Sequence, residues 1–339
     1  MGRKTVPTIK MFSISKRQRL QNVIDNKPVD HVPCSFWFHF IEKPSLFSMI
    51  DRPSASDVLF EGQKNYVAEF DPDFVKVMSD GYFTYPDEAL AKGQTVEEWK
   101  KVAFVPPDHK WVRMQVEHVK RLTSLFPDTP MFYNFFSPSC MLRWTLGKEN
   151  YLRLILTAPE AARKILSTVG ESVKGLAKAV ISEGGADGLY YIVQNPDMNV
   201  VSSAVYTSVI TPSDKMVLDA ANAVSSNHTL LHICGYAGVK NDLSIFTSYE
   251  SAIVNWAVNV EGVSLKEGKS LFGGRAVMGG FPNTVGAILE TGSRDEVQSF
   301  TKKLTSDAGS VGVIIAADCS LRLTQDVSHL FWVREALEN

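Results

Sequence analysis

The residues best suited to metal chemistry are His232 and Cys234 in "LLHICG", together with Cys319 in "AADCSL". Side chains alternate along a β-strand, so residues 232 and 234 share one face. Catalytic zinc typically takes three protein ligands from cysteine, histidine and carboxylates and keeps one position for water or substrate. Thiolates with an imidazole suit zinc better than magnesium or calcium. Spacing alone also fits a buried histidine and an inert core cysteine, so both interpretations stay open at this point.

Eight short apolar segments recur along the chain, each followed by a longer amphipathic stretch. The predicted strands are 32–38, 74–78, 131–136, 188–193, 230–234, 252–257, 276–281 and 311–317. Most are continuous apolar runs, as expected of parallel strands that are buried on both faces. Eight β-then-α units predict an α/β fold, a single (β/α)8 TIM barrel over residues 1–339, rather than an open doubly wound sheet. Helical patterns before about residue 130 predict extra N-terminal helices that cap the barrel.

The stretches between the strands carry helix start and stop signals. Residues 157–188 place Pro159 in the first turn of a long helix and Gly184-Gly185 at its end. Similar patterns predict helices within 211–227, 293–309 and 324–338.

In a barrel of this kind, active-site residues come from the carboxyl ends of the strands and the loops that follow. The positions at these ends are His39, Asp80, Ser137, Asn195, Cys234, Asn255, Phe281 and Cys319. His232 and Cys234 would come from the end of the fifth strand and Cys319 from the end of the eighth. The mouth of a barrel brings such remote strand ends within reach of one ion, so these three residues are the candidate metal ligands.

Composition excludes several other classes of function. Lys+Arg 35 against Asp+Glu 37 gives a net charge of −2, so no global field favours nucleic acid or an anionic membrane. No apolar stretch approaches the roughly 20 residues of a membrane helix, and the basic first 21 residues lack the apolar core of a secretory signal. We therefore expect a cytoplasmic protein. Four irregularly spaced cysteines do not form a disulfide framework, and Cys34 and Cys140 are predicted to be structural.

Four segments of the chain resemble the uroporphyrinogen decarboxylase superfamily. The opening "RQRLQNVIDNKPVDHVPCSFWF" resembles its first conserved segment, and "FVKVMSDGYFTYP" its strand-two segment that ends in an aspartate. "VNWAVNVEGVSLKEGK" and "GGRAVMGGFPNTVGAILETGSRDEV" are similar to two later segments of that superfamily. The resemblance extends over essentially the whole chain and implies a distorted (β/α)8 barrel, in agreement with the strand count.

Departures from the decarboxylases favour another branch. Those enzymes hold the carboxylates of their substrate with arginines after strand one, where this chain reads "FWFHFIEKPS" without arginine. An octa-anionic substrate is hard to hold without such a clamp. A glycine-histidine-glycine near their C-terminus is replaced here by "AADCSL". The chain instead resembles zinc-dependent corrinoid methyltransferases such as methylcobalamin:coenzyme M methyltransferases, and this implies zinc bound by His232, Cys234 and Cys319.

The methyltransferase resemblance implies transfer of a methyl group between a corrinoid and a thiol or folate acceptor. The corrinoid would be methylcobalamin or would sit on a separate corrinoid protein, because the sequence carries no cobalamin-binding domain. Two alternatives stay open. The first is a decarboxylase-like lyase that uses Asp80 without a metal, and the second is a non-catalytic barrel that binds a corrinoid or tetrapyrrole.

Five further residues are predicted at the mouth. Asp80 matches the strand-two aspartate of the decarboxylases and is assigned a catalytic role with His39, although "SDG" is also ordinary turn chemistry and His39 could be structural. Asn255 lies where the zinc methyltransferases often place an acid as a fourth ligand. An amide is a poorer zinc ligand, so we expect an open fourth position. Asn255, Asn195 and Tyr133 are predicted to contact the substrate.

Overall fold

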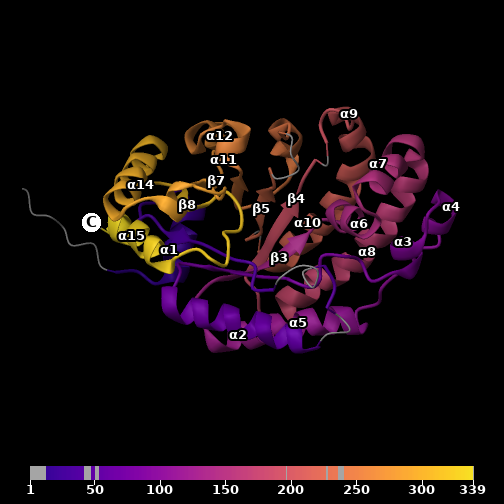
Figure 1. The fold of residues 1–339 in the computed structure, drawn as a ribbon, viewed down its shortest axis with the longest axis horizontal. Coiled ribbons are helices and arrows are strands. Elements are labelled where there is room, and N and C mark those ends of the chain that lie inside the picture. Colours follow the sequence, from indigo (N-terminus) through magenta and orange to yellow (C-terminus); the bar gives the residue numbers. More distant parts are fainter. Residues whose placement is uncertain are drawn as a thin grey trace, which may run out of the picture.

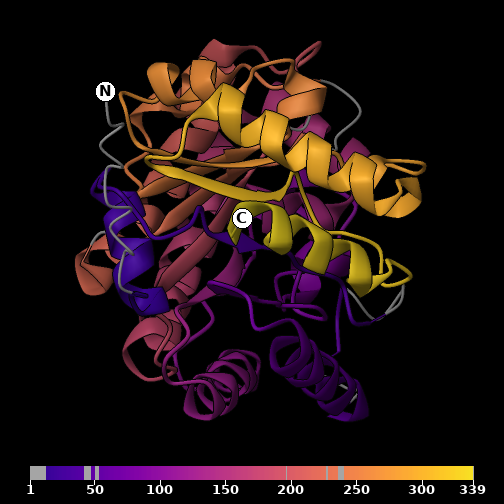
Figure 2. The same ribbon diagram turned by 90° about the vertical axis from the view of Figure 1, so that its left-hand side faces the viewer.

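The architecture is a barrel of parallel strands surrounded by helices (Figures 1 and 2). The computed structural model describes residues 13–41, 47–49, 53–195, 197–226, 228–235 and 240–338. Within these ranges, eight strands form one hydrogen-bonded ladder in the order β1-β8-β7-β6-β5-β4-β3-β2, and every pair is parallel. The predicted (β/α)8 barrel is confirmed.

Each strand lies within a predicted strand or coincides with it. The bounds are β1 Cys34–Ser35, β2 Val75–Val77, β3 Met131–Phe136, β4 Gly188–Val193, β5 Leu230–Ile233, β6 Ile253–Trp256, β7 Ala276–Phe281 and β8 Val313–Ala317. The largest difference is β1, which is two residues long. It pairs with β8 only at Cys34 and Ser35 and meets the chain after β8 again at a single bridge between Phe38 and Leu321.

The gap in the ladder between β1 and β2 is bridged by hydrogen bonds that are not part of the strand pairing. The amide of Asp73 donates to the carbonyl of Cys34 (3.3 Å), and the hydroxyl of Ser35 donates to the carbonyl of Phe74 (2.7 Å). One carboxylate oxygen of Asp73 also accepts from the amide of Cys34 (2.8 Å), and the other accepts from the buried guanidinium of Arg19 (2.7 Å). These contacts nearly close the barrel.

Helices follow most strands and form the outer layer. In the first half they are α1 Lys16–Ile24, α2 Pro53–Phe70, α3 Glu88–Lys92, α4 Val96–Trp99, α5 Lys110–Leu125, α6 Pro138–Leu146, α7 Lys148–Thr157 and α8 Pro159–Ser182. In the second half they are α9 Ser203–Val205, the π-helix Tyr206–Ile210, α10 Thr211–Ser225, the 3₁₀-helix Leu243–Ser248, α11 Val258–Glu261, α12 Leu265–Leu271, α13 Ile288–Thr291, α14 Arg294–Ala308 and α15 Val327–Glu338. Helices α2 and α5 lie side by side in both views (Figures 1 and 2).

Local sequence signals explain the long helices. Pro159 occupies the first turn of α8. Backbone N–H groups there have no acceptor within the helix, so the missing N–H of proline costs no hydrogen bond. In α14, Ser293 and Glu296 form a capping box, in which each side chain accepts from the backbone amide of the other residue. Both helices agree with the sequence prediction.

Helix α1 contacts segments that lie just before the strands. Arg17 pairs with Asp187 ahead of β4, and Gln21 shares a hydrogen bond with His228 ahead of β5 (2.9 Å). These contacts place α1 at the amino-terminal end of the barrel. The broader expectation of extra N-terminal helices that cap the barrel stays a prediction.

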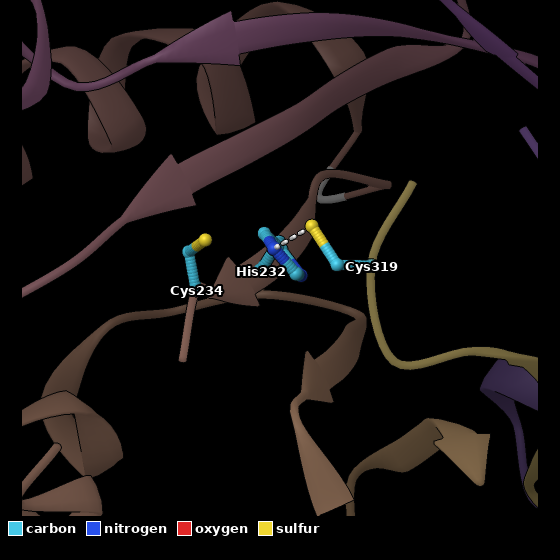
Figure 3. A group of neighbouring side chains, drawn as sticks. All are labelled: His232, Cys234 and Cys319. Carbon is cyan, nitrogen blue, oxygen red and sulfur yellow. Dashed lines mark hydrogen bonds between the residues drawn. The ribbon is translucent and has the colours of Figure 1, made fainter. Parts of the chain in front are cut away.

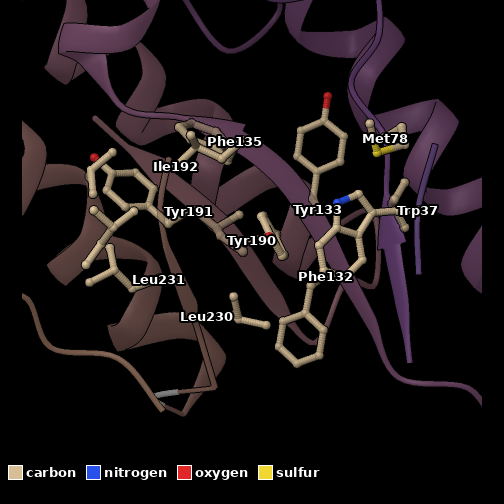
Figure 4. Packing of buried hydrophobic residues seen from close by; sticks show 14 of the residues in the cluster. Trp37, Met78, Phe132, Tyr133, Phe135, Tyr190, Tyr191, Ile192, Leu230 and Leu231 are labelled. Carbon is tan, nitrogen blue, oxygen red and sulfur yellow. The ribbon is translucent and has the colours of Figure 1, made fainter. Parts of the chain in front are cut away.

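Aromatic side chains pack on both faces of the barrel strands (Figure 4). The rings of Trp37 from the segment after β1 and Tyr190 from β4 meet edge to face, with centroids 5.2 Å apart, and both residues are buried. Along β4 the next side chain, Tyr191, points the other way and donates its hydroxyl hydrogen to the backbone of Asp214 in α10 (2.8 Å). No helix among the described residues is long and apolar enough to cross a membrane.

Asp214 is a buried carboxyl in the helical layer. Its oxygens accept from the amide of Ser139 at the start of α6 (3.5 Å) and from the hydroxyl of Tyr206 (3.2 Å), and Ser137 and Tyr249 also hydrogen-bond to it. Burial raises the pKa of Asp214 to about 7, and these hydrogen bonds offset only part of the effect. The folded protein therefore prefers the protonated acid.

This preference makes stability depend on pH. Because the folded pKa of Asp214 lies above its usual value of 3.8, the stabilisation is complete below about pH 4 and is lost as the pH rises through 7. Between about pH 5.5 and 7.5, the free energy of unfolding should fall by about 1–2 kcal/mol more for the wild type than for Asp214→Asn. Buried His118, whose pKa is lowered to about 4 by burial, acts equally on both proteins. Urea unfolding at several pH values measures the difference, and parallel curves would contradict it.

Candidate metal centre

His232, Cys234 and Cys319 come together at the mouth of the barrel (Figure 3). In the part of the chain that the structure describes, they form the one group of three or more His, Cys, Asp or Glu side chains that could hold a metal. One ligand atom from each lies within 4.8 Å of the others, and Cys319 Sγ is 3.7 Å from His232 Nε2. His232 is buried and both cysteines are half-buried, so the centre opens towards the mouth.

The orientation of His232 is fixed by a chain of hydrogen bonds. Asn255 in β6 donates its amide N–H to the carbonyl of Met278 in β7 (2.9 Å), which leaves its Oδ1 facing the barrel interior. That oxygen accepts from the hydroxyl of Tyr190 (2.7 Å) and pairs with Nδ1 of His232. An amide oxygen can only accept, so Nδ1 carries the hydrogen and Nε2 presents its lone pair to the cysteines.

Cys319 is positioned by the residue before it. Asp318 is fully buried, and its carboxylate accepts from the amide of Gly280 (3.1 Å) and from the amide and side chain of Asn259 (3.0 and 2.9 Å). The amide of Asp318 donates to the carbonyl of Phe281 (2.7 Å). These bonds fix the turn after β8. Gly279 adopts φ +140°, which other residues rarely adopt, and an added Cβ would also lie tightly against Asn255 at 3.3 Å.

Cys234 is positioned through its backbone. Its carbonyl accepts from the side-chain N–H of Asn241 (3.0 Å). Asn241 is itself held by both oxygens of Glu261 (2.7 and 2.9 Å). Glu261 therefore supports the strand end rather than contributing a ligand atom. Next to Cys234, Gly235 leaves room for β6, because an added Cβ would lie 2.6 Å from Ala257.

The donor set fits zinc. Zinc–sulfur and zinc–nitrogen bonds of about 2.3 and 2.0–2.1 Å at tetrahedral angles place sulfur and nitrogen about 3.6 Å apart, close to the 3.7 Å between Cys319 and His232. A hydrogen bond with Cys234 lowers the pKa of Cys319 well below that of an ordinary thiol, against the effect of burial, and His232 and Lys76 act in the same direction. The thiolate form of Cys319, which is the form that binds metal, is therefore favoured.

His39 and Asp80 form a second polar pair at the rim. His39 Nδ1 lies 2.8 Å from one oxygen of Asp80, and the amide of Phe40 donates to the other (2.7 Å). Asp80 is fully buried, whereas the His39 side chain is 37 % exposed. The two residues lie together, and Asp80, with both oxygens engaged, is placed to orient His39. Glu42 of the same segment lies outside the described residues.

The three residues that were predicted to contact a substrate are all engaged within the protein. Tyr133 lies on the outer face of β3, and its hydroxyl donates to Gln115 in α5 (2.7 Å), so it faces the helical layer. Asn195 is buried and holds its own loop, bonding to the carbonyl of Val201 and the amide of Asp197. Asn255 is buried against His232 and orients that ligand instead of contacting a substrate.

Comparison with known proteins supports this architecture. The uroporphyrinogen decarboxylase (URO-D) family model matches residues 91–339. The chain belongs to the uroporphyrinogen decarboxylase family. A solved structure of a methyltransferase from Methanosarcina mazei superposes with a TM-score of 0.72 at 15% identity, covering 96% of this chain and 98% of that one, which shows the shared fold. A search of curated proteins finds no match.

The family match covers the strands that carry the metal ligands. The match to the family model begins at residue 91. It therefore includes β3 to β8 and the residues His232, Cys234 and Cys319. His39 and Asp80 precede the matched segment. The rim pair therefore rests on the geometry of this chain alone.

Two charged neighbours of the centre were not among the residues predicted from the sequence. Lys76 is a charged residue in the middle of the apolar strand "FVKVM", at an inward position of β2, and Asp318 sits directly before Cys319. Both charged residues stand out in the sequence, because a charge that is buried in a strand or directly after one needs a partner. What the sequence did not show was which groups would surround them.

Removing the partner of His232 should weaken the metal centre. We expect Asn255→Ala to lower zinc affinity by about 10- to 100-fold, because Nδ1 loses the acceptor that sets its tautomer. Competition with a chromophoric chelator measures the affinity. Asn222→Ala is the matched control, since Asn222 also donates a buried amide to a backbone carbonyl (2.9 Å) but lies in α10. Equal zinc affinities of the two variants would contradict the assignment.

Cys319 should differ in reactivity from Cys34 and Cys140. Burial raises the pKa of Cys34 to about 12 and of Cys140 to about 11, so neither forms a thiolate at neutral pH. In metal-free protein at about pH 7.5, iodoacetamide should label Cys319 much faster than Cys34 or Cys140, and zinc should protect Cys319. Peptide mass spectrometry measures the labelling. Similar rates at all three sites, or no protection by zinc, would refute this expectation.

Proposed function

We propose that the chain is a zinc-dependent methyltransferase that moves a methyl group between a corrinoid and a thiol or folate acceptor. The observation that carries the proposal is the His232, Cys234 and Cys319 cluster, three donors suited to zinc with one coordination position left for a substrate. The M. mazei methyltransferase fold and the sequence resemblance to corrinoid methyltransferases support the same reaction class.

Zinc, when bound, would hold the sulfur of a thiol substrate and favour its thiolate form at neutral pH. The residues of this chain would position the reacting sulfur and accept its proton. Asn255 and Asp318 fix two of the ligands, so the reacting sulfur would be held in one place. Displacement at a methyl carbon depends mainly on such alignment.

His39 is suited to accept the proton that the thiol releases. Its Nδ1 is bound to the buried Asp80, so Nε2 is the nitrogen left to exchange protons at the rim. The bridge between Phe38 and Leu321 places His39 beside the chain that leaves Cys319. In this role Asp80 stabilises the imidazolium that forms and does not itself contact the substrate.

Aromatic rings at the same rim favour a flat methyl carrier. The ring of Phe83 lies 5.9 Å from that of His39 and 4.6 Å from that of Phe136. Phe136 in turn lies 6.5 Å from Trp144, which is 37 % exposed. Such a wall can stack against a corrin or a folate ring system. A corrinoid protein would present its cofactor to this side of the barrel.

The alternatives have less structural support. A metal-free lyase would use Asp80 on the substrate directly, but both of its oxygens are engaged within a fully buried site. Nor does the segment after β1, "FWFHFIEKPS", contain an arginine for a polycarboxylate. A non-catalytic corrinoid-binding barrel would have no use for a cysteine held as a thiolate.

The proposal predicts that metal and activity are lost together. Wild-type protein should contain about one zinc per chain and convert methylcobalamin in the presence of an acceptor thiol or folate. Cys319→Ser should lose the zinc and at least about 100-fold of the activity, because a ligand and the thiolate are both removed. Elemental analysis and the visible spectrum of the cobalamin provide the two readouts.

Cys140→Ser is the control, because Cys140 is a buried thiol in α6 with no place in the cluster. It should retain zinc and activity. A folded wild-type protein without zinc would contradict the proposal. Zinc-loaded protein that transfers no methyl group between methylcobalamin, a thiol panel and a folate panel would instead favour the non-catalytic barrel.

A further inference from the structure

Lys76 is a buried cation inside the barrel. It lies in β2, and its ammonium is 4.1 Å from the ring centroid of Tyr190 and 5.1 Å from that of Trp37. Among the hydrogen bonds and ion pairs of the described residues, none involves Nζ of Lys76. The two rings are therefore its direct partners. Cation–π contacts of this kind offset part of the hydration free energy that the ammonium loses on burial, but they do not neutralise its charge.

The charge of Lys76 acts on the metal centre. The Tyr190 ring that contacts Lys76 also packs against the imidazole of His232, with ring centroids 5.2 Å apart (Figure 4 shows Tyr190 in the barrel). Burial lowers the pKa of Lys76 to about 8, and the charges of Cys319, Cys234 and Asp80 oppose that shift. Lys76 is therefore mostly protonated at neutral pH, and the anionic groups whose charge acts on it are the sulfurs of Cys319 and Cys234 and the carboxylate of Asp80.

A charge count explains why a buried cation would be useful there. A zinc ion with two thiolates and a neutral imidazole carries no net charge. A thiolate in the fourth position makes the centre −1, and an uncompensated charge inside a barrel is costly. Counted over zinc, its four ligands and Lys76, the complex with an anionic fourth ligand is neutral, whereas the complex with a neutral fourth ligand carries a net charge of +1.

We propose that Lys76 is a positioning residue that makes the metal centre select an anionic fourth ligand, such as a thiolate, over a neutral one. The inference rests on the metal centre of the proposed function and specifies the substrate class that it admits. Lys76 acts through the electrostatic field of the site, without ligating the metal or contacting the reacting methyl group.

Ligand selection by a cobalt-substituted centre tests this role without requiring turnover. Cobalt(II) reports its fourth ligand in the visible spectrum, so azide and imidazole can be titrated as an anionic and a neutral probe. Lys76→Met should weaken azide binding by about tenfold or more relative to imidazole, which is about 1.4 kcal/mol. Lys76→Arg, which keeps the charge, should stay within about threefold of wild type. A thiol such as 2-mercaptoethanol should follow azide.

The outcomes separate the Lys76 role from the proposed reaction. A ratio of azide to imidazole affinity that is unchanged in Lys76→Met, or shifted equally in Lys76→Arg, overturns the role of the charge. Lys76→Gln provides a second neutral variant if Lys76→Met does not fold, and it should give the same shift. Protein that binds no cobalt overturns both proposals. A shifted ratio without methyl transfer by the zinc enzyme supports the role of Lys76 and overturns only the methyltransferase assignment.

Discussion

The hydrogen bond between His232 and Asn255 is the contact on which the rest of the centre depends. The carbonyl of Met278 fixes the amide of Asn255, the amide oxygen fixes the hydrogen on Nδ1 of His232, and Nε2 is left to face two cysteines. Each step uses a group that the barrel already places, since β5, β6 and β7 are consecutive neighbours in the sheet. A flip of one amide would turn a metal ligand into a hydrogen-bond donor.

The barrel gives its four cysteines two different environments. Cys34 and Cys140 are fully buried, and the effect of burial outweighs the nearby charged groups and keeps both as neutral thiols. Cys319 is partly buried too, but a hydrogen bond with Cys234, the imidazole and the ammonium of Lys76 together favour its thiolate. The same residue type is therefore inert in one place and a candidate metal ligand in another, because the surrounding charges differ.

The barrel could be predicted from the sequence because it depends on a strong, simple pattern, whereas the cluster also needed the resemblance to the corrinoid methyltransferases. Continuous apolar runs mark parallel strands, and β3, β4 and β7 have the predicted bounds. The period-two rule put His232 and Cys234 on one face. The same rule separates Tyr133 from its neighbours Phe132 and Asn134. Those two side chains point inwards, whereas Tyr133 contacts α5. The role of Asn255 could not be predicted, because it depends on contacts between β5, β6 and β7 that no local pattern specifies.

Zinc K-edge X-ray absorption of the purified protein tests the central claim most directly, because it reports the atoms around the metal. The account predicts two sulfur scatterers at about 2.3 Å and one imidazole nitrogen at about 2.0–2.1 Å, with the fourth position taken by a light atom. Addition of an acceptor thiol should raise the number of sulfur scatterers from two to three. A shell of oxygen and nitrogen without sulfur, or a shell unchanged by thiols, would contradict a His232, Cys234 and Cys319 centre that is open to a thiolate substrate.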